Sequence, residues 1–451
     1  MARALSPAFL RIGGTAADLL RFQEKSFFEP LSNESATIAS GSDSCYCTSD
    51  RREDAHSCEK KVRRNFTMTG HDWMQINEFA IKSNLKILFD LNVLRRDSRG
   101  QWSTSNAKKL LKFSSKLGFN SIAWELGNEP NSFHHVFNVT LSGTQLGRDF
   151  KRLHHLLASF PDFANSTLVG PDINQIRRCV GKKHVCKPLR YLKNVMQSSK
   201  GVLDALTWHQ YYLNGRTARL KDFLSAKVLD SFQEETDAVK KFLGKSHVPI
   251  WLGETSSAYG GGAKGLSDRY VAGFLWLDKL GLAALNKYSV IIRQTFYHGC
   301  YALIGPDLLP NPDFWISALY KKLVGNRVLK VTKDFITEAN LRLYSHCAKN
   351  GAGSVVLFGL NLANKTASFH LPPELSRSRI EHYVVSPLNG DLRSRSLLLN
   401  GKLLGLINSQ LPPLLPRVTS KMPQLALKAW QMAYWVFPDV KAKACQTSTF
   451  P

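Results

Sequence analysis

Acidic residues are scarce in this sequence of 451 residues. It contains 35 Asp and Glu against 60 Lys and Arg, which gives a formal net charge of +25 and a pI near 9.8. This excess of positive charge attracts polyanions, so nucleic acid, anionic membranes and sulfated glycans are all compatible partners. No RNP-like, zinc-finger or helix-turn-helix signature accompanies the charge, which disfavours a nucleic-acid-binding protein.

Long apolar runs are absent as well. No run of ~18 apolar residues occurs, which excludes a membrane-spanning helix of the usual kind. Residues Met1 to Pro7 hold no apolar core, so we expect no secretory signal peptide in the sequence as printed and either a cytosolic protein or a missing start. The 43% hydrophobic and 21% charged content is that of a folded protein.

The eight cysteines lack the paired C-x₂-C spacing of structural zinc sites, so we expect no metal and no cofactor. Cys179 and Cys186 are close enough in sequence to pair locally, whereas Cys45, Cys47 and Cys58 have no assignable partner. Five N-x-[ST] sequons are candidate glycosylation sites: Asn33, Asn65, Asn138, Asn165 and Asn364. Together, the sequons and the dispersed cysteines favour an oxidising compartment.

From about residue 73 to residue 300, short apolar runs alternate with amphipathic stretches, which is typical of βα units around a parallel sheet. The expected strands are Ala8–Ile12, Leu85–Leu91, Ser121–Leu126, Leu168–Asp172, Ala205–Gln210, Pro249–Gly253 and Val290–Phe296. The expected helices include Asn106–Leu117, Gln145–Ser159 and Ser231–Leu243. Seven strands are one fewer than a (β/α)₈ TIM barrel needs, so we expect the missing first strand to precede residue 8, with an open sheet as the alternative.

The rest of the chain divides by composition. Residues 29–60 are rich in Ser, Asp, Glu and Thr and read as a linker. After residue 331 short strand-like runs predict a C-terminal β-sandwich, with strands at Val355–Leu360, His382–Val385, Ser396–Leu399 and Met432–Phe437. We therefore expect an N-terminal part of the barrel over 1–28, a linker or processing segment over 29–60, the catalytic barrel over 61–330 and the sandwich over 331–451.

Two glutamates end apolar strand runs, Glu129 after Ile122-Ala-Trp-Glu-Leu-Gly-Asn128 and Glu254 after Pro249-Ile-Trp-Leu-Gly253. In a barrel both would lie at the catalytic edge. Retaining glycosidases use two carboxyl groups ~5–5.5 Å apart, one as acid/base and one as nucleophile. A single glutamate after a strand is often only a solvated loop residue or a helix-cap partner. The preceding Asn128 favours a sugar site, because it can donate a hydrogen bond to a 2-hydroxyl group.

Three motifs resemble the heparanase family: Trp124-Glu-Leu-Gly-Asn-Glu-Pro-Asn-Ser-Phe133, Trp208-His-Gln-Tyr-Tyr-Leu-Asn-Gly-Arg-Thr217 and Trp251-Leu-Gly-Glu-Thr-Ser-Ser-Ala-Tyr-Gly-Gly-Gly262. The likeness runs from Ser6 to Cys445 and is weakest between residues 23 and 80. It implies an endo-β-glucuronidase that cleaves heparan sulfate with retention, with Glu129 as proton donor and Glu254 as nucleophile.

The resemblance also implies the substrate-binding residues. Around the cleaved uronic acid it places Asn128, His209, Tyr211, Tyr259, Gly260, Gly261, Gln294 and Tyr301, and Arg216 belongs to the second motif. His209 and Tyr211 lie two apart on a strand end, so their side chains point the same way, although a buried structural pair has the same spacing. The glycines leave backbone N–H groups open to a sugar carboxylate, although a flexible loop would also be glycine-rich.

Two basic clusters would flank the cleft and match the family's heparin-binding segments: Lys60, Lys61, Arg63 and Arg64, and Arg177 and Arg178 with the basic residues that follow them. Solvated loops or a processing site are the alternatives. The stretch Cys179–Cys186 looks inserted relative to the family. His134 and His135 replace a family lysine, so we expect the grip on an acidic substrate to increase as the pH falls towards ~6.

Further expectations follow from the resemblance alone. Residues 29–60 correspond to a segment that a processing protease excises, which would leave a two-chain heterodimer. Cys347 and Cys445 match a disulfide. The expected partners are heparan sulfate, heparin and heparan sulfate proteoglycans, and the expected locations are the lysosome, the extracellular matrix after secretion, and membrane-associated sites. Two competing readings stay open: a heparan-sulfate-binding protein without catalysis, and a nucleic-acid-binding protein.

Overall fold

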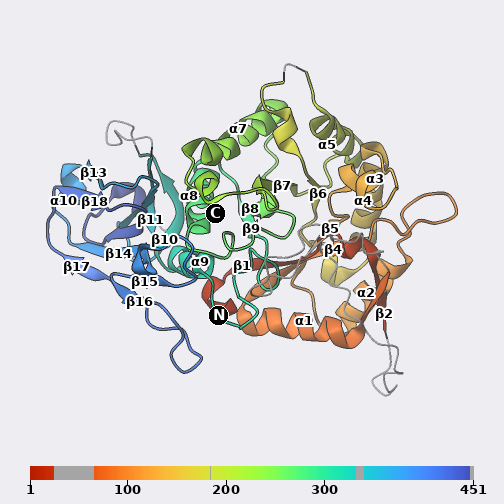
Figure 1. Ribbon diagram of the computed structural model, residues 1–451. Coiled ribbons are helices and arrows are strands. Elements are labelled where there is room, and N and C mark those ends of the chain that lie inside the picture. The colour runs from red at the N-terminus through yellow and green to blue at the C-terminus, as the bar shows by residue number, and fades with distance from the viewer. Residues whose placement is uncertain (25–64, 183, 332–339, 447–451) are drawn as a thin grey trace, which may run out of the picture.

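The computed structural model describes residues 1–24, 65–182, 184–331 and 340–446. The predicted linker over residues 29–60 lies outside these ranges, and so do Asn33, Lys60, Lys61 and Lys183. The described chain forms an α/β part and, beside it, a C-terminal part built mainly from strands (Figure 1).

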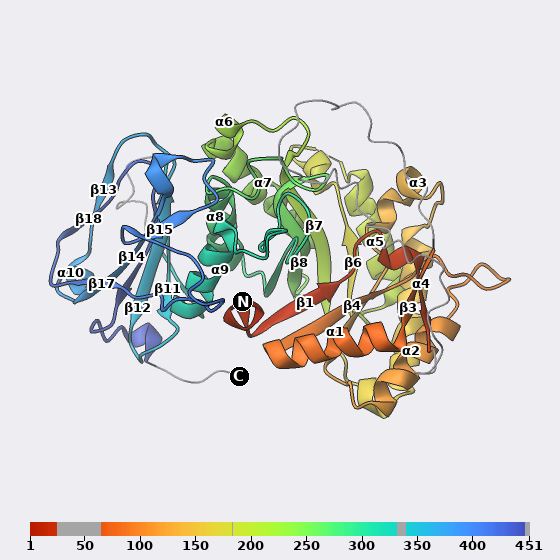
Figure 2. The ribbon, with the colours of Figure 1, turned by 60° about the horizontal axis from the view of Figure 1, so that its bottom comes forward.

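Seven parallel strands form the centre of the α/β part (Figure 2). Three of them pair in the order β1-β4-β5 and four in the order β6-β7-β8-β9. A parallel bridge between Trp124 and Leu168 joins the two groups. Their bounds are β1 Ala8–Ile12, β4 Leu85–Leu91, β5 Ile122–Leu126, β6 Val169–Ile173, β7 Ala205–Asn214, β8 Ile250–Tyr259 and β9 Val290–Arg293. Each of the seven predicted strands is therefore present.

The α/β class is confirmed, whereas the described residues do not confirm the closure of an eight-stranded barrel. Among the described residues no ladder joins β9 to β1, so the seven strands make a row that is open between these two. Side chains still meet across the interior, where the rings of Phe9 and Trp251 lie 5.0 Å apart between their centroids. They belong to a small apolar core that also contains Leu88, Ala123 and Val169, one residue from each of three further strands.

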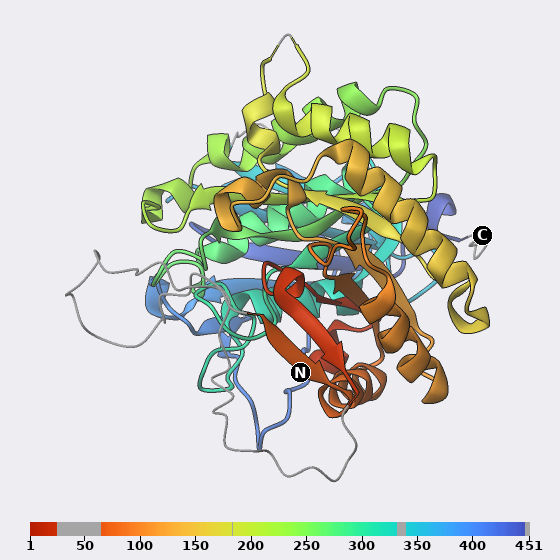
Figure 3. The same cartoon turned by 90° about the vertical axis from the view of Figure 1, so that its right-hand side faces the viewer.

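Helices cover the outer side of these strands (Figure 3). Their bounds are α1 Gly70–Ser83, α2 Ser105–Lys116, α3 Phe133–Val136, α4 Gly143–Ala158, α5 Lys187–Ser199, α6 Leu220–Phe223, α7 Ala226–Leu243, α8 Ala272–Leu285 and α9 Pro312–Leu323. The predicted helical stretches fall within one residue of the bounds of α2, within two residues of those of α4, and inside α7. Thr69 and Asp72 form a capping box that fixes the start of α1. A small parallel pair, β2 Leu20–Gln23 and β3 Phe66–Thr69, flanks the main row.

The C-terminal part contains a large antiparallel sheet in the order β10-β11-β12-β19-β14-β15-β16, with β17 also paired to β14. The strands are β10 Val324–Leu329, β11 Leu341–Ala348, β12 Val355–Asn361, β14 Ile380–Pro387, β15 Leu397–Leu399, β16 Lys402–Leu403, β17 Arg417–Thr419 and β19 Met432–Phe437. A second sheet pairs β13 Ala367–His370 with β18 Gln424–Leu427, and the short helix α10 spans Pro373–Ser376. Strand β10 begins upstream of residue 331, where the sandwich was predicted to start.

The two sheets share an apolar core, in which Phe369 of β13 and Leu425 of β18 pack with Trp435 of β19. This arrangement is the expected sandwich, with one small and one large sheet. The other face of the large sheet packs on α8 and α9, where the Tyr344 hydroxyl donates a 2.6 Å hydrogen bond to Asp278. Helix α8 is buried between the two parts and is apolar on all sides, as such a position requires.

Two disulfides are present in the described chain, Cys179–Cys186 and Cys347–Cys445. Both agree with the sequence-based expectation. The four sequon asparagines that the structure describes, at 65, 138, 165 and 364, are exposed, so glycosylation there stays a prediction without a steric obstacle. None of the described helices is long and apolar enough to span a bilayer.

Candidate active site

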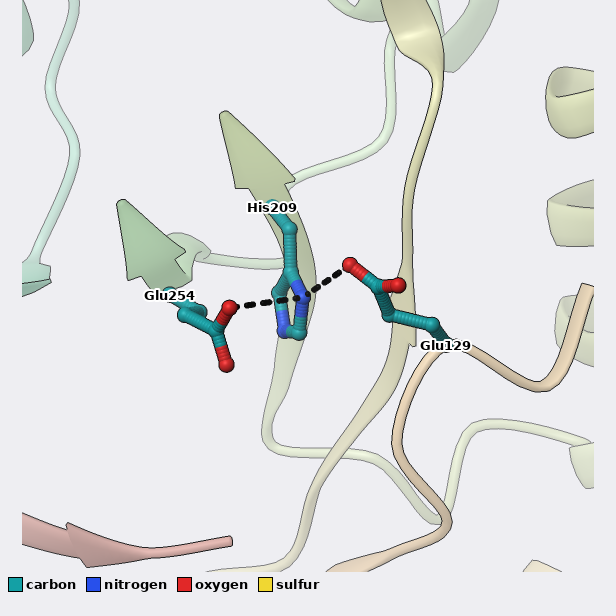
Figure 4. Close-up of side chains that lie close together, drawn as sticks. All are labelled: Glu129, His209 and Glu254. Atoms are coloured by element: carbon teal, nitrogen blue, oxygen red, sulfur yellow. Dashed lines mark hydrogen bonds and ion pairs between the residues drawn. The ribbon is translucent and has the colours of Figure 1, made fainter. Parts of the chain in front are cut away.

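The two predicted catalytic glutamates lie together at the carboxyl ends of the parallel strands. Glu129 follows β5 and has a left-handed backbone, with φ of 53°. Glu254 lies inside β8, which continues past the predicted end at Gly253 as far as Tyr259. One carboxylate oxygen of each glutamate and one ring nitrogen of His209 all lie within 4.8 Å of one another (Figure 4). The tertiary structure therefore brings together two side chains that are 125 positions apart in the sequence.

Each oxygen of Glu129 has its own donor. The Asn174 side-chain amide donates a 2.7 Å hydrogen bond to Oε2, and His209 Nδ1 lies 2.9 Å from Oε1. The side chain is still 27% exposed, so a substrate can reach it. This combination of fixed orientation and access suits a group that exchanges a proton with a bound ligand.

Glu254 is held at both oxygens as well. The Tyr211 hydroxyl donates to Oε1 at 2.5 Å, and Arg11 Nη1 donates to Oε2 at 3.1 Å. Its side chain is 12% exposed. Two donors keep the carboxylate in one orientation and stabilise its negative charge, as a nucleophile requires before it attacks.

His209 projects from β7 between the two carboxylates (Figure 4). The register between β7 and β8 shifts after Trp208, and this irregularity aligns His209 with Glu254 instead of Gly253. Burial lowers the pKa of His209, but the neighbouring carboxylates of Glu254 and Asp172 outweigh that effect and raise the pKa well above its ordinary value. The ring is therefore an imidazolium at neutral pH.

Arg11, in β1, is the centre of a buried charge cluster under the two glutamates. Its guanidinium contacts Glu125 at 2.6 Å, Asp172 at 2.5 Å and Asp90 at 3.6 Å, in addition to Glu254. All three inner carboxylates are buried. The cation balances part of this negative charge and links four strands of the row.

The carboxyl groups of this cluster titrate differently. Burial raises the pKa of Glu125 to about 8 and the pKa of Asp18 to about 7. Burial, together with Asp18, also raises the pKa of Asp90 well above its ordinary value. Burial acts on Asp172 in the same direction, but Arg11 and His209 overcome it and lower its pKa. Asp172 is thus the member of the cluster that stays ionised.

Two sets of side chains bring possible metal ligands within 4.8 Å of one another in the described chain: Glu129 with His209 and Glu254, and Asp90 with Glu125 and Asp172. In each set, a positively charged side chain of the protein already lies next to the carboxyl groups. His209 supplies the positive charge in the first set, and the Arg11 guanidinium contacts every carboxylate of the second. We therefore assign neither set as a metal site, and the expected lack of a metal and a cofactor stays a prediction.

The remaining predicted residues around the uronic acid fall into a buried and an exposed group. Asn128 is buried and accepts a 3.1 Å hydrogen bond from Arg11 through Oδ1. The Gln294 amide donates to the Tyr301 hydroxyl at 3.4 Å, and the Tyr301 ring lies 6.5 Å from that of Tyr211. Tyr211 in turn contacts Glu254, and the binding of a uronic acid by this group stays a prediction.

Tyr259, Gly260 and Gly261 form the exposed rim of the site. The Tyr259 side chain is 51% exposed. Gly260 and Gly261 have φ of 76° and 85°, a conformation that side-chain-bearing residues adopt only at a cost. The Gly261 carbonyl accepts a hydrogen bond from the Cys300 amide, which anchors the loop beside the strand-end residues.

The predicted basic residues do not behave alike. Arg177 donates a 2.5 Å hydrogen bond to the Tyr212 carbonyl, so its guanidinium links the segment after β6 to β7. Arg178 and Arg216 are exposed. His134 and His135 are exposed with their rings 3.6 Å apart. His134, Lys187 and Arg190 line a cavity of about 260 Å³, and Pro130 of the Asn-Glu-Pro motif lines it as well.

Sequence reasoning missed Arg11, Asp172 and Asn174, which contact the catalytic pair or its neighbours. A signal was present for two of them, since each is a lone charge within an apolar strand run, Phe9-Leu-Arg-Ile12 and Val169-Gly-Pro-Asp-Ile173. Buried charges are rare without partners. Two opposite charges, each alone in an apolar strand run, therefore pointed to an ion pair under the site.

Comparison with known proteins identifies the family. Residues 2–281 match the family model described as glycosyl hydrolase family 79, N-terminal domain. A heparanase from Gallus gallus is 39% identical over 99% of this chain and 88% of its own length. A hyaluronoglucuronidase from Hirudo nipponia is 33% identical over 98% and 89%, and an inactive heparanase-2 from Homo sapiens is 31% identical over 99% and 82%.

Among solved structures, a 4-O-α-L-rhamnosyl-β-D-glucuronidase from Fusarium oxysporum superposes with a TM-score of 0.62. It covers 95% of this chain and 88% of its own, at 16% identity, and so supports the fold alone. The family match extends over more than half of the chain, and both strand-end glutamates lie in it. The chain therefore belongs to glycosyl hydrolase family 79 and is a glycoside hydrolase.

Proposed function

We propose that this chain is an endo-β-glucuronidase that hydrolyses internal bonds of heparan sulfate with retention of configuration. The observation that carries the mechanism is the separation of the two carboxylates, whose nearest ligand oxygens lie within 4.8 Å of each other. Retaining enzymes hold their carboxyl groups about 5–5.5 Å apart, whereas inverting enzymes leave roughly 6.5–9.5 Å for a water molecule.

In the first step, Glu129 gives its proton to the glycosidic oxygen while Glu254 attacks the anomeric carbon. The bond to the leaving sugar breaks, and a glycosyl ester forms on Glu254. In the second step, Glu129 takes a proton from water, and the oxygen of that water displaces Glu254 from the sugar. Tyr211 and Arg11, which donate hydrogen bonds to the Glu254 oxygens, stabilise this carboxylate when it leaves the sugar.

The substrate class follows from the relatives and from charge. Heparanases cover nearly the whole chain, and a net charge of +25 suits a sulfated polyanion. The exposed Arg178, Arg216 and His134 around the site would contact sulfate groups, while Tyr259 to Gly261 would bind the uronic carboxylate. Lys60 and Lys61, which lie outside the described residues, are proposed to bind the same substrate.

Hyaluronan is the second candidate substrate, because the hyaluronoglucuronidase from Hirudo nipponia is 33% identical over 98% of the chain. A heparan-sulfate-binding protein without catalysis is the alternative of another kind, since inactive heparanase-2 is also related. The intact pair of glutamates favours catalysis. We further propose that the seven strands belong to a (β/α)₈ barrel, and that residues 29–60 are removed by a protease to give two chains.

We also propose that the protein acts in the lysosome and, after secretion, in the extracellular matrix and at membrane-associated proteoglycans. Two disulfides and four exposed sequons among the described residues support an oxidising route. Localisation of a tagged protein in cells, with and without enzymatic deglycosylation, tests this part independently of activity.

The decisive experiment is chain-length analysis of heparan sulfate and of hyaluronan after incubation at mildly acidic pH. Shortened heparan sulfate with intact hyaluronan is the expected result. Glu129→Ala and Glu254→Ala should each abolish cleavage, whereas Glu234→Ala, a matched change at an exposed position of α7, should not. Full binding of heparan sulfate without shortening by the parent protein would sink the enzyme proposal.

A further inference from the structure

We propose that Asp172 is a positioning residue of the reaction, whose carboxylate fixes His209 as a cation between the acid/base and the nucleophile. The proposal rests on the function proposed above for Glu129 and Glu254. Asp172 does not contact the reacting atoms and acts through His209, so it is distinct from the catalytic residues themselves.

The side chain of Asp172 is linked to both glutamates through the His209 ring, and its backbone contacts Glu129 directly. Its Oδ1 lies 3.4 Å from His209 Nε2, and the opposite ring nitrogen, Nδ1, lies 2.9 Å from Glu129 Oε1 and 4.0 Å from Glu254 Oε1. Its backbone carbonyl accepts a 3.1 Å hydrogen bond from the Glu129 amide. One residue at the end of β6 thus orients both the backbone of the acid/base and the ring beside it.

The backbone around Asp172 is shaped for this role. Asp172 has φ of 52°, in the left-handed region, which residues with a side chain adopt uncommonly. The Thr207 hydroxyl accepts a hydrogen bond from its amide and holds the backbone in place. A β-carbon at Gly253 would lie 2.3 Å from Asp172 Oδ1, so the glycine before Glu254 provides the space for this carboxylate. Strained backbone that neighbours hold in place is typical of functional sites.

The charges around His209 explain what its ring does. Three carboxylates face it: Asp172 and Glu254 from the two adjacent strands β6 and β8, and Glu129 from the end of β5. Tyr211, on its own strand, contacts Glu254. Of the three carboxylates, both glutamates change charge in the proposed mechanism, since Glu129 passes a proton to the leaving oxygen and Glu254 becomes esterified. Asp172 takes no part in bond changes and is the constant counter-ion.

Because Asp172 keeps its negative charge, the His209 ring can stay positively charged throughout the reaction. When Glu129 has given its proton to the leaving oxygen, its new carboxylate lies next to a ring that is already positive, and no further proton has to move. Burial raises the pKa of Asp172, but Arg11 and His209 overcome this effect and keep it ionised. Asp90 and Glu125 also surround Arg11, but no ion pair joins either of them to His209 in the described chain.

The test is a pH titration of the His209 ring by NMR of protein with isotopically labelled histidine, the signal being assigned with His209→Gln. In the parent protein we expect the ring to stay protonated through neutral pH. Asp172→Asn, which keeps the shape and removes the charge, should move the titration to lower pH. Asp90→Asn removes a carboxylate from the same Arg11 cluster without touching His209 and should leave the titration where it is.

Kinetics give the second readout. Asp172→Asn should lower kcat about 10- to 100-fold, as is usual when a residue that orients a site group is lost. KM should change little, and the alkaline limb of the kcat profile should move to lower pH. A merely structural role would lower activity without moving that limb.

A neutral His209 ring at pH 7 in the parent protein overturns the proposal without any variant, which covers the case in which Asp172→Asn does not fold. An equal shift in Asp172→Asn and Asp90→Asn overturns it too. The titration needs no turnover, whereas heparan sulfate cleavage by the parent tests the proposed function, so the two failures are distinguishable.

Discussion

The Tyr211 hydroxyl donates a 2.5 Å hydrogen bond to Oε1 of Glu254. Two positions earlier on the same strand, His209 reaches towards the other glutamate. Because alternate residues of a strand share a face, β7 serves both carboxylates from one side. The hydroxyl proton stabilises Glu254 as an anion and also holds it in the orientation for attack.

Tyr211→Phe removes this bond while keeping the ring. A hydrogen bond to a charged group contributes about 1.5–3 kcal/mol, so we expect kcat to fall at least tenfold. The fold should be retained, since the hydroxyl has no structural partner besides the carboxylate in the described chain. Steady-state kinetics on heparan sulfate, with a thermal melt of both proteins, measure this. Unchanged kcat would contradict the role given to the hydroxyl.

Arg11→Met leaves the carboxylates of Asp172 and Glu254 without their shared cation. Removing one partner of a buried ion pair costs about 3–5 kcal/mol, and we expect a loss of unfolding free energy in this range at pH 7. The loss should shrink at acidic pH, because protonation then neutralises carboxyl groups that have no cation. Urea unfolding at two pH values checks both statements, and an equal loss at both would count against the ion-pair explanation.

Stability of the parent protein should fall as the pH rises from about 5 to about 8. Burial raises the pKa of Glu125 to about 8, of Asp18 to about 7 and of Asp278 to about 6. In the unfolded chain these groups are already ionised above roughly pH 4.5, so the folded state binds more protons and is favoured at acidic pH. This contribution is lost as the pH passes through the folded pKa values.

Glu125→Gln should flatten this pH dependence, because glutamine does not titrate. The slope that one such group contributes is at most about 1.4 kcal/mol per pH unit. Urea midpoints at several pH values for parent and variant measure the difference. Glu234→Gln, at an exposed position of α7, is the matched control and should leave the slope as it is.

The two disulfides should differ in their contribution to stability. Cys347–Cys445 closes a loop with a sequence separation of 98, and Cys179–Cys186 one of 7. Chain entropy predicts about 4.7 kcal/mol for a loop of roughly 100 residues and less than about 3 kcal/mol for one shorter than about 15. Replacing each pair by serine and comparing urea unfolding tests the order, and a larger loss from the short loop would reverse it.

The exposed pair His134 and His135 gives the last prediction. Heparin affinity should increase as the pH falls from about 7.5 to about 6, since histidine side chains gain charge in that range. The double change to alanine should remove most of the increase, while His247→Ala, outside the site, should not. Affinity measured at constant ionic strength decides this, and a pH-independent affinity in the parent would refute the prediction.

The sequence by itself determined the elements and the catalytic pair. The seven parallel strands are short runs in which apolar residues predominate, a pattern that local sequence carries. Glu129 and Glu254 stand out because each interrupts such a run at its carboxyl end. Helix α8 carries no such local signal, since it is buried between two sheets and shows no amphipathic period.

Only the tertiary structure decided how the charges meet. Arg11, Glu125 and Asp172 are isolated in the sequence. The distances of 2.6 Å from Arg11 to Glu125 and 2.5 Å from Arg11 to Asp172 depend on the register between strands and on the irregularities at Gly170 and Trp208. The approach of the Glu129 and Glu254 carboxylates to within 4.8 Å depends on the strand register in the same way. Electrostatic energy varies with distance and burial, which composition and spacing do not contain, so the ionisation of this site is a property of the folded chain.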